Sequence, residues 1–321
     1  MAPQSKRVLI LGVTGVIGQV LTCAILNAQD VFDRVGVLTS AATAASKSEL
    51  LNSFRARGAD VIIGDINDEA FMFNTFQGFD TIVSALGRSA IELQIDLIRI
   101  ANASPSITRF IPSEYGTDIA FDATSASEKP HRAKLKVRAF LESDAVQHLA
   151  YTYLVTGPFA DLYAGDMSSE PQLGSFNVAR KEATLLGDGK GPLGLTTMAD
   201  VGRFLVAILK NPKVCDGKAI KVNSFTSTPE EILAEMERQT DTKWNVQYTP
   251  LDALRRNEKD AWNQGNPLAS LYTLRRIWTE GKTQCENTDN ESIGICKTDT
   301  LEMVVQSILS NPISGFQSGK L

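Results

Sequence analysis

Short apolar runs alternate with amphipathic segments over the first 160 residues of the chain. An uninterrupted apolar run predicts a β-strand buried on both faces, whereas apolar residues three or four positions apart predict a helix. The run at 8–11 is of the first kind, and the spacing of Val20, Leu21, Ala24 and Ile25 is of the second. The pattern predicts strands at 8–11, 34–39, 61–65, 81–87, 108–113 and 151–159, of which those at 8–11 and 61–65 are expected to be buried. It predicts helices at 19–28, 46–58, 71–76, 91–103 and 130–143.

Strands and helices in alternation build a parallel sheet covered by helices on both faces. We therefore predict an α/β fold, a Rossmann-type doubly wound sheet, with ligands at the carboxyl ends of its strands. The regular alternation of predicted strands and helices ends after residue 160, where residues typical of loops become frequent. We predict a dinucleotide-binding domain at 1–158 and a smaller C-terminal substrate-binding lobe at 159–321. Helices are expected at 197–209 and 228–239, the latter opened by a capping box at Thr228. A strand at 219–223 could rejoin the first domain.

A glycine-rich turn joins the first strand to the first helix, with Gly12, Gly15 and Gly18 three positions apart. A strand, a glycine turn and a helix in that order are typical of a dinucleotide-binding unit, because the backbone can approach the pyrophosphate at the helix N-terminus. The cofactor-binding candidates here are Gly12, Thr14, Gly15, Val16, Ile17 and Gly18.

The end of the second strand carries no acid, where an NAD site would usually place one to hold the ribose hydroxyls. Thr39 and Ser40 can donate hydroxyl hydrogen bonds there, and Lys47 adds a positive charge. These residues favour NADP(H) over NAD(H). Asp65, at the end of the third strand, is a candidate near adenine, with a helix N-cap as the equally weighted alternative.

The ends of the later strands carry further candidates. Small residues close the fourth strand, and the fifth and sixth end on the rim where a nicotinamide would lie. Tyr115 could reach a substrate carbonyl or pack under the nicotinamide, and Phe159 is expected at the edge of the substrate pocket. The cofactor-binding candidates at these ends are Ser84, Ala85, Leu86, Gly87, Ser113, Gly157, Pro158 and Phe159.

Composition narrows the class of protein. The chain contains 43% hydrophobic and 21% charged residues and has a net charge of −5. This composition does not suggest a surface that binds nucleic acid or a membrane. The first seven residues lack the apolar core of a signal peptide, and no apolar run approaches a membrane span, so we expect a cytoplasmic protein. The four cysteines are expected as free thiols, although Cys285 and Cys296 flank a polar loop and could pair under oxidising conditions. With two histidines in the chain, no metal site is expected.

Lys134 is the candidate catalytic residue. Short-chain reductases commonly carry a tyrosine four positions before the helical lysine, but Pro130 stands there. Proton transfer would then fall to Lys134, provided that burial or a neighbouring cation lowers its pKa. A surface lysine in a basic helix is the alternative. His131 could face the same pocket, although a solvated position is favoured. The aromatic residues of the second half are expected in its core, with one or two lining a pocket: Trp244, Trp262, Trp278, Tyr272 and Phe225.

The segments 109–116, 134–138, 151–154 and 157–159 resemble the isoflavone-reductase-like, NmrA-like family of atypical short-chain reductases. The segments 197–202 and 228–232 resemble its fungal branch. The resemblance implies that Lys134 is the catalytic lysine, that Arg138 contacts the cofactor and that Lys47 lies near the 2′-phosphate. Thr39 replaces the family's usual arginine. The histidine that some plant members use for substrate has no match here, and the nearest aligned residue is Arg275.

Taken together, we expect an NADPH-dependent reductase of an aromatic or polyketide-like small molecule, with Lys134 donating or relaying the proton. Two alternatives stay open. One is a non-redox enzyme on the same fold, such as a cyclase, isomerase or dehydratase. The other is a non-catalytic regulator that senses the dinucleotide. A homodimer is compatible with the sequence.

Overall fold

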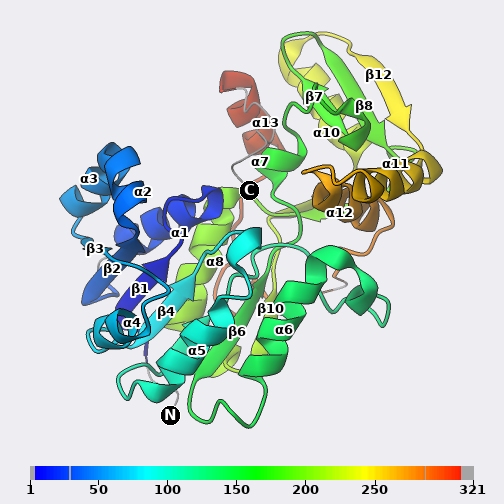
Figure 1. Cartoon of the computed structure of the whole chain (residues 1–321). Coiled ribbons are helices and arrows are strands. Elements are labelled where there is room, and N and C mark those ends of the chain that lie inside the picture. The colour runs from blue at the N-terminus through cyan, green and yellow to red at the C-terminus, as the bar shows by residue number, and fades with distance from the viewer. Residues whose placement is uncertain (1–3, 29, 286, 312–321) are drawn as a thin grey trace.

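A seven-stranded sheet organises the larger part of the chain, in the computed structural model that describes residues 4–28, 30–285 and 287–311 (Figure 1). Neighbouring strands are parallel throughout, in the order β10-β6-β5-β4-β1-β2-β3. The strands are β1 (Arg7–Leu11), β2 (Arg34–Thr39), β3 (Asp60–Ile63), β4 (Thr81–Ser84), β5 (Arg109–Ile111), β6 (Ala150–Val155) and β10 (Lys218–Lys221). The predicted doubly wound sheet is confirmed.

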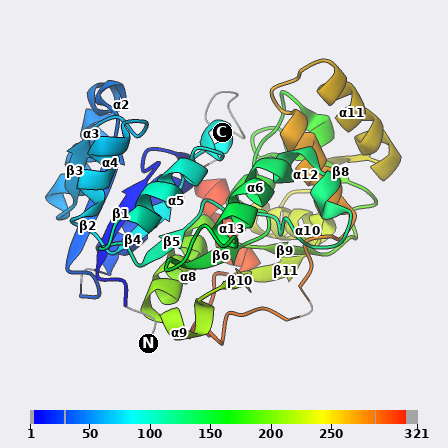
Figure 2. The same ribbon diagram turned by 60° about the horizontal axis from the view of Figure 1, so that its bottom comes forward.

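Helices cover both faces of this sheet, and Figure 2 shows three of them, α4, α5 and α6, in a row. These three are α4 (Glu69–Phe76), α5 (Gln94–Ala103) and α6 (Arg132–Leu141). The opposite face carries α1 (Val16–Asn27), α3 (Ser48–Ala56) and α8 (Met198–Lys210). Shorter helical segments are α2 (Ala41–Ser46), η1 (Arg88–Ala90), η2 (Ser125–Ser127), η3 (Lys129–His131) and α9 (Pro212–Cys215).

The apolar run at the start of the chain is continuous because β1 is central. Val8 and Ile10 pack into the cluster beneath α1 and α8, whereas Leu9 and Leu11 pack into the cluster beneath α4 and α5. Alternate side chains of a strand point to opposite faces, so both sets must be apolar. The strand order reverses between β1 and β4, and ligands bind at such a switch point in open α/β sheets.

A second cluster of buried residues forms a smaller lobe at one end of the sheet, at the upper right of Figure 1. It contains a three-stranded sheet of order β12-β8-β7 and the strand pair β11-β9. These strands are β7 (Ser175–Asn177), β8 (Glu182–Leu186), β9 (Leu193–Leu195), β11 (Phe225–Ser227) and β12 (Asn245–Thr249). Its helices are α7 (Ala160–Tyr163), η4 (Pro171–Leu173), α10 (Pro229–Thr240), α11 (Leu251–Asn263), α12 (Ala269–Thr279) and α13 (Leu301–Ser310).

The second half of the chain is shared between the two parts. α8 packs against α1, and β10 extends the large sheet beside β6, with Ile220 opposite Leu154. The boundary predicted at residue 158 therefore separates strands β1–β6 from two later elements of the same layer structure. These are β10, which extends the sheet, and α8, which covers it beside α1. The predicted capping box at Thr228 is present, with Glu231 as its partner.

Several predicted elements differ from the observed ones. The strand predicted as buried at 61–65 is β3, which ends at Ile63 and lies at the sheet edge, so Ile63 is 46% exposed. The helix predicted at 46–58 is α3, which begins at Ser48 and ends at Ala56, and the short helix α2 before it was not predicted. The strands β7, β8 and β9 were missed because their short segments lie among glycine- and proline-containing turns, and the strands β11 and β12 were not predicted either.

No helix among the described residues is long and apolar enough to cross a membrane. The expectation on a signal peptide concerns residues 1–7, of which 1–3 lie outside the described part. All four cysteines are free thiols, Cys285 and Cys296 included.

Candidate functional site

A cavity of about 880 Å³ lies between the carboxyl ends of the sheet strands and helix α12 of the smaller lobe. It begins at the glycine turn after β1 and passes the ends of β4, β5 and β6 to the start of α6. The predicted site residues that line it are Gly12, Thr14, Gly15, Val16, Ile17, Lys47, Ala85, Leu86, Gly87, Ser113, Tyr115, Lys134, Gly157, Pro158 and Phe159. The predicted residues that are not in its lining are Gly18, Thr39, Ser40, Asp65, Ser84 and Arg138.

Two of the three glycines of the turn, Gly12 and Gly18, have no room for a side chain. Gly12 has φ of +77°, and a Cβ there would lie 2.4 Å from the carbonyl oxygen of Ala85. A Cβ on Gly18 would lie 2.1 Å from the Gly12 oxygen, so Gly18 permits close helix–strand packing and lies behind the cavity wall. Gly15 is the N-cap of α1 without a side-chain cap, and no described residue accepts from the N–H groups of Val16 and Ile17. Unpaired N–H groups at a helix N-terminus form an anion-binding site.

Lys47 lies beside this turn, and its Nζ donates to the carbonyl oxygen of Thr14 at 2.9 Å. Thr39, which ends β2, is buried. The Ser40 side chain caps α2 by accepting from the Thr43 N–H at 3.2 Å. The positive charge predicted at this end of the cavity is therefore present, whereas the Ser40 hydroxyl is engaged in local structure.

Asp65 does not reach the cavity. It is exposed, and its carboxylate accepts from the backbone and side chain of Asn67, both at 2.9 Å, in a local turn. Asp68, not Asp65, is the N-cap of α4. The N-cap interpretation of Asp65 is therefore wrong, because Asp68 caps α4 and Asp65 is held in the turn with Asn67, whereas its expected place near adenine stays a prediction. Ser84 is fully buried behind the end of β4 and does not face the cavity either.

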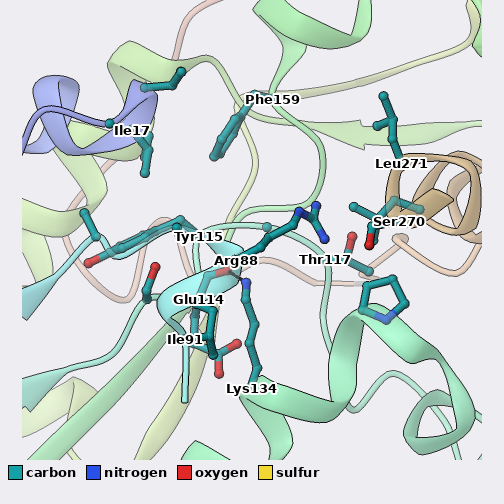
Figure 3. A pocket seen from close by; sticks show the side chains of 18 of the residues that line it. Ile17, Arg88, Ile91, Glu114, Tyr115, Thr117, Lys134, Phe159, Ser270 and Leu271 are labelled. Carbon is teal, nitrogen blue, oxygen red and sulfur yellow. Dashed lines mark hydrogen bonds between the residues drawn. The ribbon is translucent and has the colours of Figure 1, made fainter. Parts of the chain in front are cut away.

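Lys134 points into the cavity from the first turn of α6 (Figure 3). Its Nζ donates to the backbone carbonyl oxygen of Glu114. Burial is the main cause that lowers the pKa of Lys134 to about 8, with the charges of Arg88 and Arg138 acting in the same direction and that of Glu114 opposing them. An amine with a pKa near 8 can give up its proton close to neutral pH.

Arg138 is one helical turn beyond Lys134, but its guanidinium is fully engaged inside the protein. Its Nε and Nη2 donate to the two carboxylate oxygens of Glu114 at 3.0 and 2.9 Å. The side chains of Arg138 and Glu114 are 10% and 2% exposed, and the guanidinium stacks on the ring of Tyr153 at 4.3 Å. Arg138 thus holds Glu114, whose carbonyl anchors Lys134. We revise its expected role from cofactor contact to positioning of that loop.

Tyr115 and Phe159 face the same opening as Ile17 of the glycine turn (Figure 3). Tyr115 is 7% exposed, and its hydroxyl has no hydrogen-bond partner among the described residues. Burial, aided by the Glu114 charge, raises the pKa of Tyr115 well above its usual range. The Tyr115 hydroxyl therefore keeps its proton at neutral pH, and no second group that titrates near pH 7 stands beside Lys134.

His131 is buried, contrary to the solvated position favoured from sequence. It is 1% exposed, and its Nδ1 lies 3.0 Å from the backbone oxygen of Ser125. Burial lowers the pKa of His131 to about 4. Since the ring is neutral at pH 7 and fixed by Ser125, it forms a wall of the cavity.

Helix α12 closes the far side of the cavity. Trp278 lines it and donates from Nε1 to the Thr117 hydroxyl at 2.7 Å, while Trp244 packs in the lobe core. Arg275 is 1% exposed, with its guanidinium over the rings of Tyr163 and Trp278 at 4.3 and 5.5 Å. Arg275 therefore fixes the aromatic wall.

Sequence reasoning missed several lining residues. Arg88 comes directly after Gly87 at the carboxyl end of β4, and this position at a strand end was the available signal. Lys129, Ser270 and Leu271 reach the cavity only because α12 and the loop before α6 fold across the strand ends. No group of histidine, cysteine, aspartate and glutamate side chains within the described ranges could hold a metal ion.

Comparison with known proteins agrees with this architecture. The family model described as NmrA-like matches residues 4–275. An isoflavone reductase of Pisum sativum is 29% identical over 86% of this chain and 89% of its own length. An oxidoreductase of Aspergillus flavus, aprR, is 27% identical over 84% of this chain and 86% of its own. The leucoanthocyanidin reductase of Vitis vinifera, solved with NADPH, superposes with a TM-score of 0.80 over 95% of this chain and 100% of that one, at 20% identity. The chain belongs to the NmrA-like family.

Proposed function

We propose that this chain is an NADPH-dependent reductase of an aromatic or polyketide-like small molecule, with Lys134 as proton donor or relay. The observation that carries the proposal is the position of Lys134. Its ammonium is held on the Glu114 carbonyl, in a cavity that begins at the glycine turn. The names of the relatives, reductases of isoflavones and phenylcoumaran benzylic ethers, support the same class of reaction.

The residues present fit a dinucleotide phosphate. The glycine turn leaves space that a Cβ would fill, the N-terminus of α1 offers unpaired N–H groups, and no acid lies in the first turn of that helix. The pyrophosphate would lie there, and Lys47 would face the 2′-phosphate beyond the end of β2. When bound, NADPH supplies the hydride, which would go to an enone, quinone-methide-like or ether carbon of the substrate.

The protein's part in the reaction is to orient the substrate and to move one proton. Aromatic rings of Tyr115, Phe159, Tyr163 and Trp278 offer faces on which a planar substrate can stack. Among the groups around this space, His131 titrates too low and Tyr115 too high to serve near pH 7. Lys134 is the remaining donor, and Glu114 positions it through a backbone atom.

The test is hydride transfer measured directly. Purified protein is incubated with NADPH carrying deuterium at the 4-pro-R or 4-pro-S position and a panel of aromatic enones and benzylic ethers. We expect NADPH consumption, and deuterium in the product from one of the two labelled cofactors. Product formed without NADPH consumption would instead indicate a cyclase, isomerase or dehydratase. NADPH binding without turnover across the panel would favour the sensing protein.

Two glycine substitutions should separate cofactor binding from folding. Gly15→Ala places its Cβ 3.4 Å from the Gly12 oxygen, an ordinary contact, so the fold should persist while NADPH binds about tenfold more weakly. Gly18→Ala places its Cβ 2.1 Å from the same oxygen and should cost about 1–3 kcal/mol of stability, as overpacking does. Urea unfolding and NADPH titration measure the two effects. If the two variants lost stability and NADPH affinity to the same extent, the assignment of Gly15 to cofactor binding and of Gly18 to packing would be contradicted.

Lys47 is expected to set the preference for the phosphorylated cofactor. Lys47→Ala should raise the KM for NADPH about tenfold, because a charge-assisted contact to phosphate is lost. The KM for NADH should change less than about twofold. Steady-state kinetics with both cofactors measure the shift. Arg55→Ala is the control, since this exposed residue of α3 donates to Asn52 on the same helix. An equal rise for both cofactors would exclude a role toward the 2′-phosphate.

A further inference from the structure

The end of the cavity away from the glycine turn is rich in cations. Arg88, Lys129, Lys134 and Arg275 line it, and Glu114 is the one acidic residue in its lining. The Glu114 carboxylate is already taken by Arg138 through two hydrogen bonds. The described lining therefore presents positive charge without an available carboxylate.

Three of these cations are engaged. Arg275 stacks on Tyr163 and Trp278, the Lys129 ammonium lies 4.4 Å from the centre of the Trp262 ring, and Lys134 is held by the Glu114 carbonyl. Arg88 differs, because no hydrogen bond or ion pair joins its side chain to another described residue. Arg88 as a whole is an exposed residue, and its guanidinium lies at the cavity, where partial desolvation lowers its pKa from the usual value.

The direction of the Arg88 side chain shows which end of the cavity its guanidinium faces. Figure 3 shows its side chain crossing the pocket above the Lys134 ammonium, with the guanidinium turned toward Thr117 and Ser270. Ile17, which marks the glycine turn, lies on the opposite side of the picture. The guanidinium thus faces α12 and the substrate end, away from the N-terminus of α1 where the pyrophosphate would lie.

We propose that Arg88 binds a carboxylate of the substrate, so that the natural substrate is an aromatic or polyketide-like acid. This inference rests on the proposed function for the identity of the cavity as a substrate site. A guanidinium matches a carboxylate through two parallel N–H···O bonds. A monoanion between Arg88 and Lys134 would also relieve the repulsion of these two cations, whereas a neutral substrate would leave both without a counter-charge.

The test compares an acid with its ester in a binding assay. 3-(4-Hydroxyphenyl)propanoic acid and its methyl ester carry no alkene to reduce, so both can be titrated calorimetrically into the NADPH-loaded protein. We expect the acid to bind at least about tenfold more tightly than the ester, since hydrogen bonds to charged groups contribute that much. Arg88→Met should abolish the difference, and Arg88→Lys should keep part of it.

The matched control is Arg99→Met, an exposed arginine of α5 that pairs with Glu69 and should leave the acid preference unchanged. Equal binding of acid and ester to the wild type would overturn the proposal. So would an acid preference that survives in Arg88→Met, or a loss of NADPH affinity in that variant without an effect on the acid. Because the assay needs no turnover, an intact acid preference in a protein without hydride transfer would refute the reductase and leave the carboxylate site standing.

Discussion

Replacing Lys134 with methionine should lower kcat by about 10²–10⁴-fold, the usual contribution of a positioned acid or base. NADPH binding should change little, because Lys134 contacts the Glu114 carbonyl at the substrate end of the cavity. Single-turnover reduction and NADPH titration of the same variant measure the two effects separately. A variant that retains more than about a tenth of wild-type kcat would exclude Lys134 as the proton donor.

The chain offers a matched control two positions along the same helix. Lys136 is exposed, and its Nζ donates to Glu92 at 2.8 Å on the outer surface. Lys136→Met removes the same charge from α6 without touching the cavity, so its kcat should equal that of the wild type. A comparable loss in both variants would point to helix stability rather than to chemistry.

The pH profile provides an independent test of the same assignment. Burial lowers the pKa of Lys134 to about 8, and a donor must be protonated to act. The value of kcat/KM should therefore be constant below this pKa and decline as the pH rises through it. Lys134→Arg should remove the decline, because an arginine keeps its proton throughout this range. A wild-type profile that is flat through pH 9 would contradict a lysine donor.

The second large effect is expected at the Glu114–Arg138 pair. Arg138→Met leaves a carboxylate that is 2% exposed without its partner, and breaking a buried ion pair costs about 3–5 kcal/mol. Glu114→Gln should also destabilise the protein, because it leaves the buried guanidinium of Arg138 without its carboxylate partner. The double variant should be less unstable than the sum of the two, because it leaves neither buried charge unpaired. Urea unfolding of the single and double variants measures this coupling.

An exposed pair serves as the reference for these values. Arg99 and Glu69 are bonded at 2.9 Å, but their side chains are 50% and 63% exposed, so Arg99→Met should cost less than about 1 kcal/mol. If Arg138→Met left the stability unchanged and weakened NADPH binding instead, Arg138 would be a cofactor contact, as the resemblance to the family implied.

The cofactor end of the site could be predicted because its determinants are local in sequence. The apolar run, the three glycines and the helix that follows are contiguous, and residues at strand ends such as Gly87 and Ser113 reach one edge of any parallel sheet. Lys134 could be predicted as a candidate because short-chain reductases carry a lysine on this helix and because the segment 134–138 resembles the family. Local reasoning could not show that β3 is an edge strand that ends at Ile63, or that Asp65 lies outside the cavity lining.

The substrate end depended on contacts between distant segments. Whether Arg138 faces a cofactor or a carboxylate depends on Glu114, 24 residues earlier, and the burial of His131 depends on the loop around Ser125. Arg275 and Trp278 line the cavity only because α12 closes over it. By itself, the sequence determined the α/β architecture, the glycine turn and the choice of Lys134 as the candidate catalytic residue, because periodicity and motif spacing act within one or two elements. Only the tertiary structure decided which charges around the cavity are paired, as in Glu114–Arg138, and that Arg88 has no hydrogen-bond or ion-pair partner among the described residues, because pairing is set by segments that meet after folding.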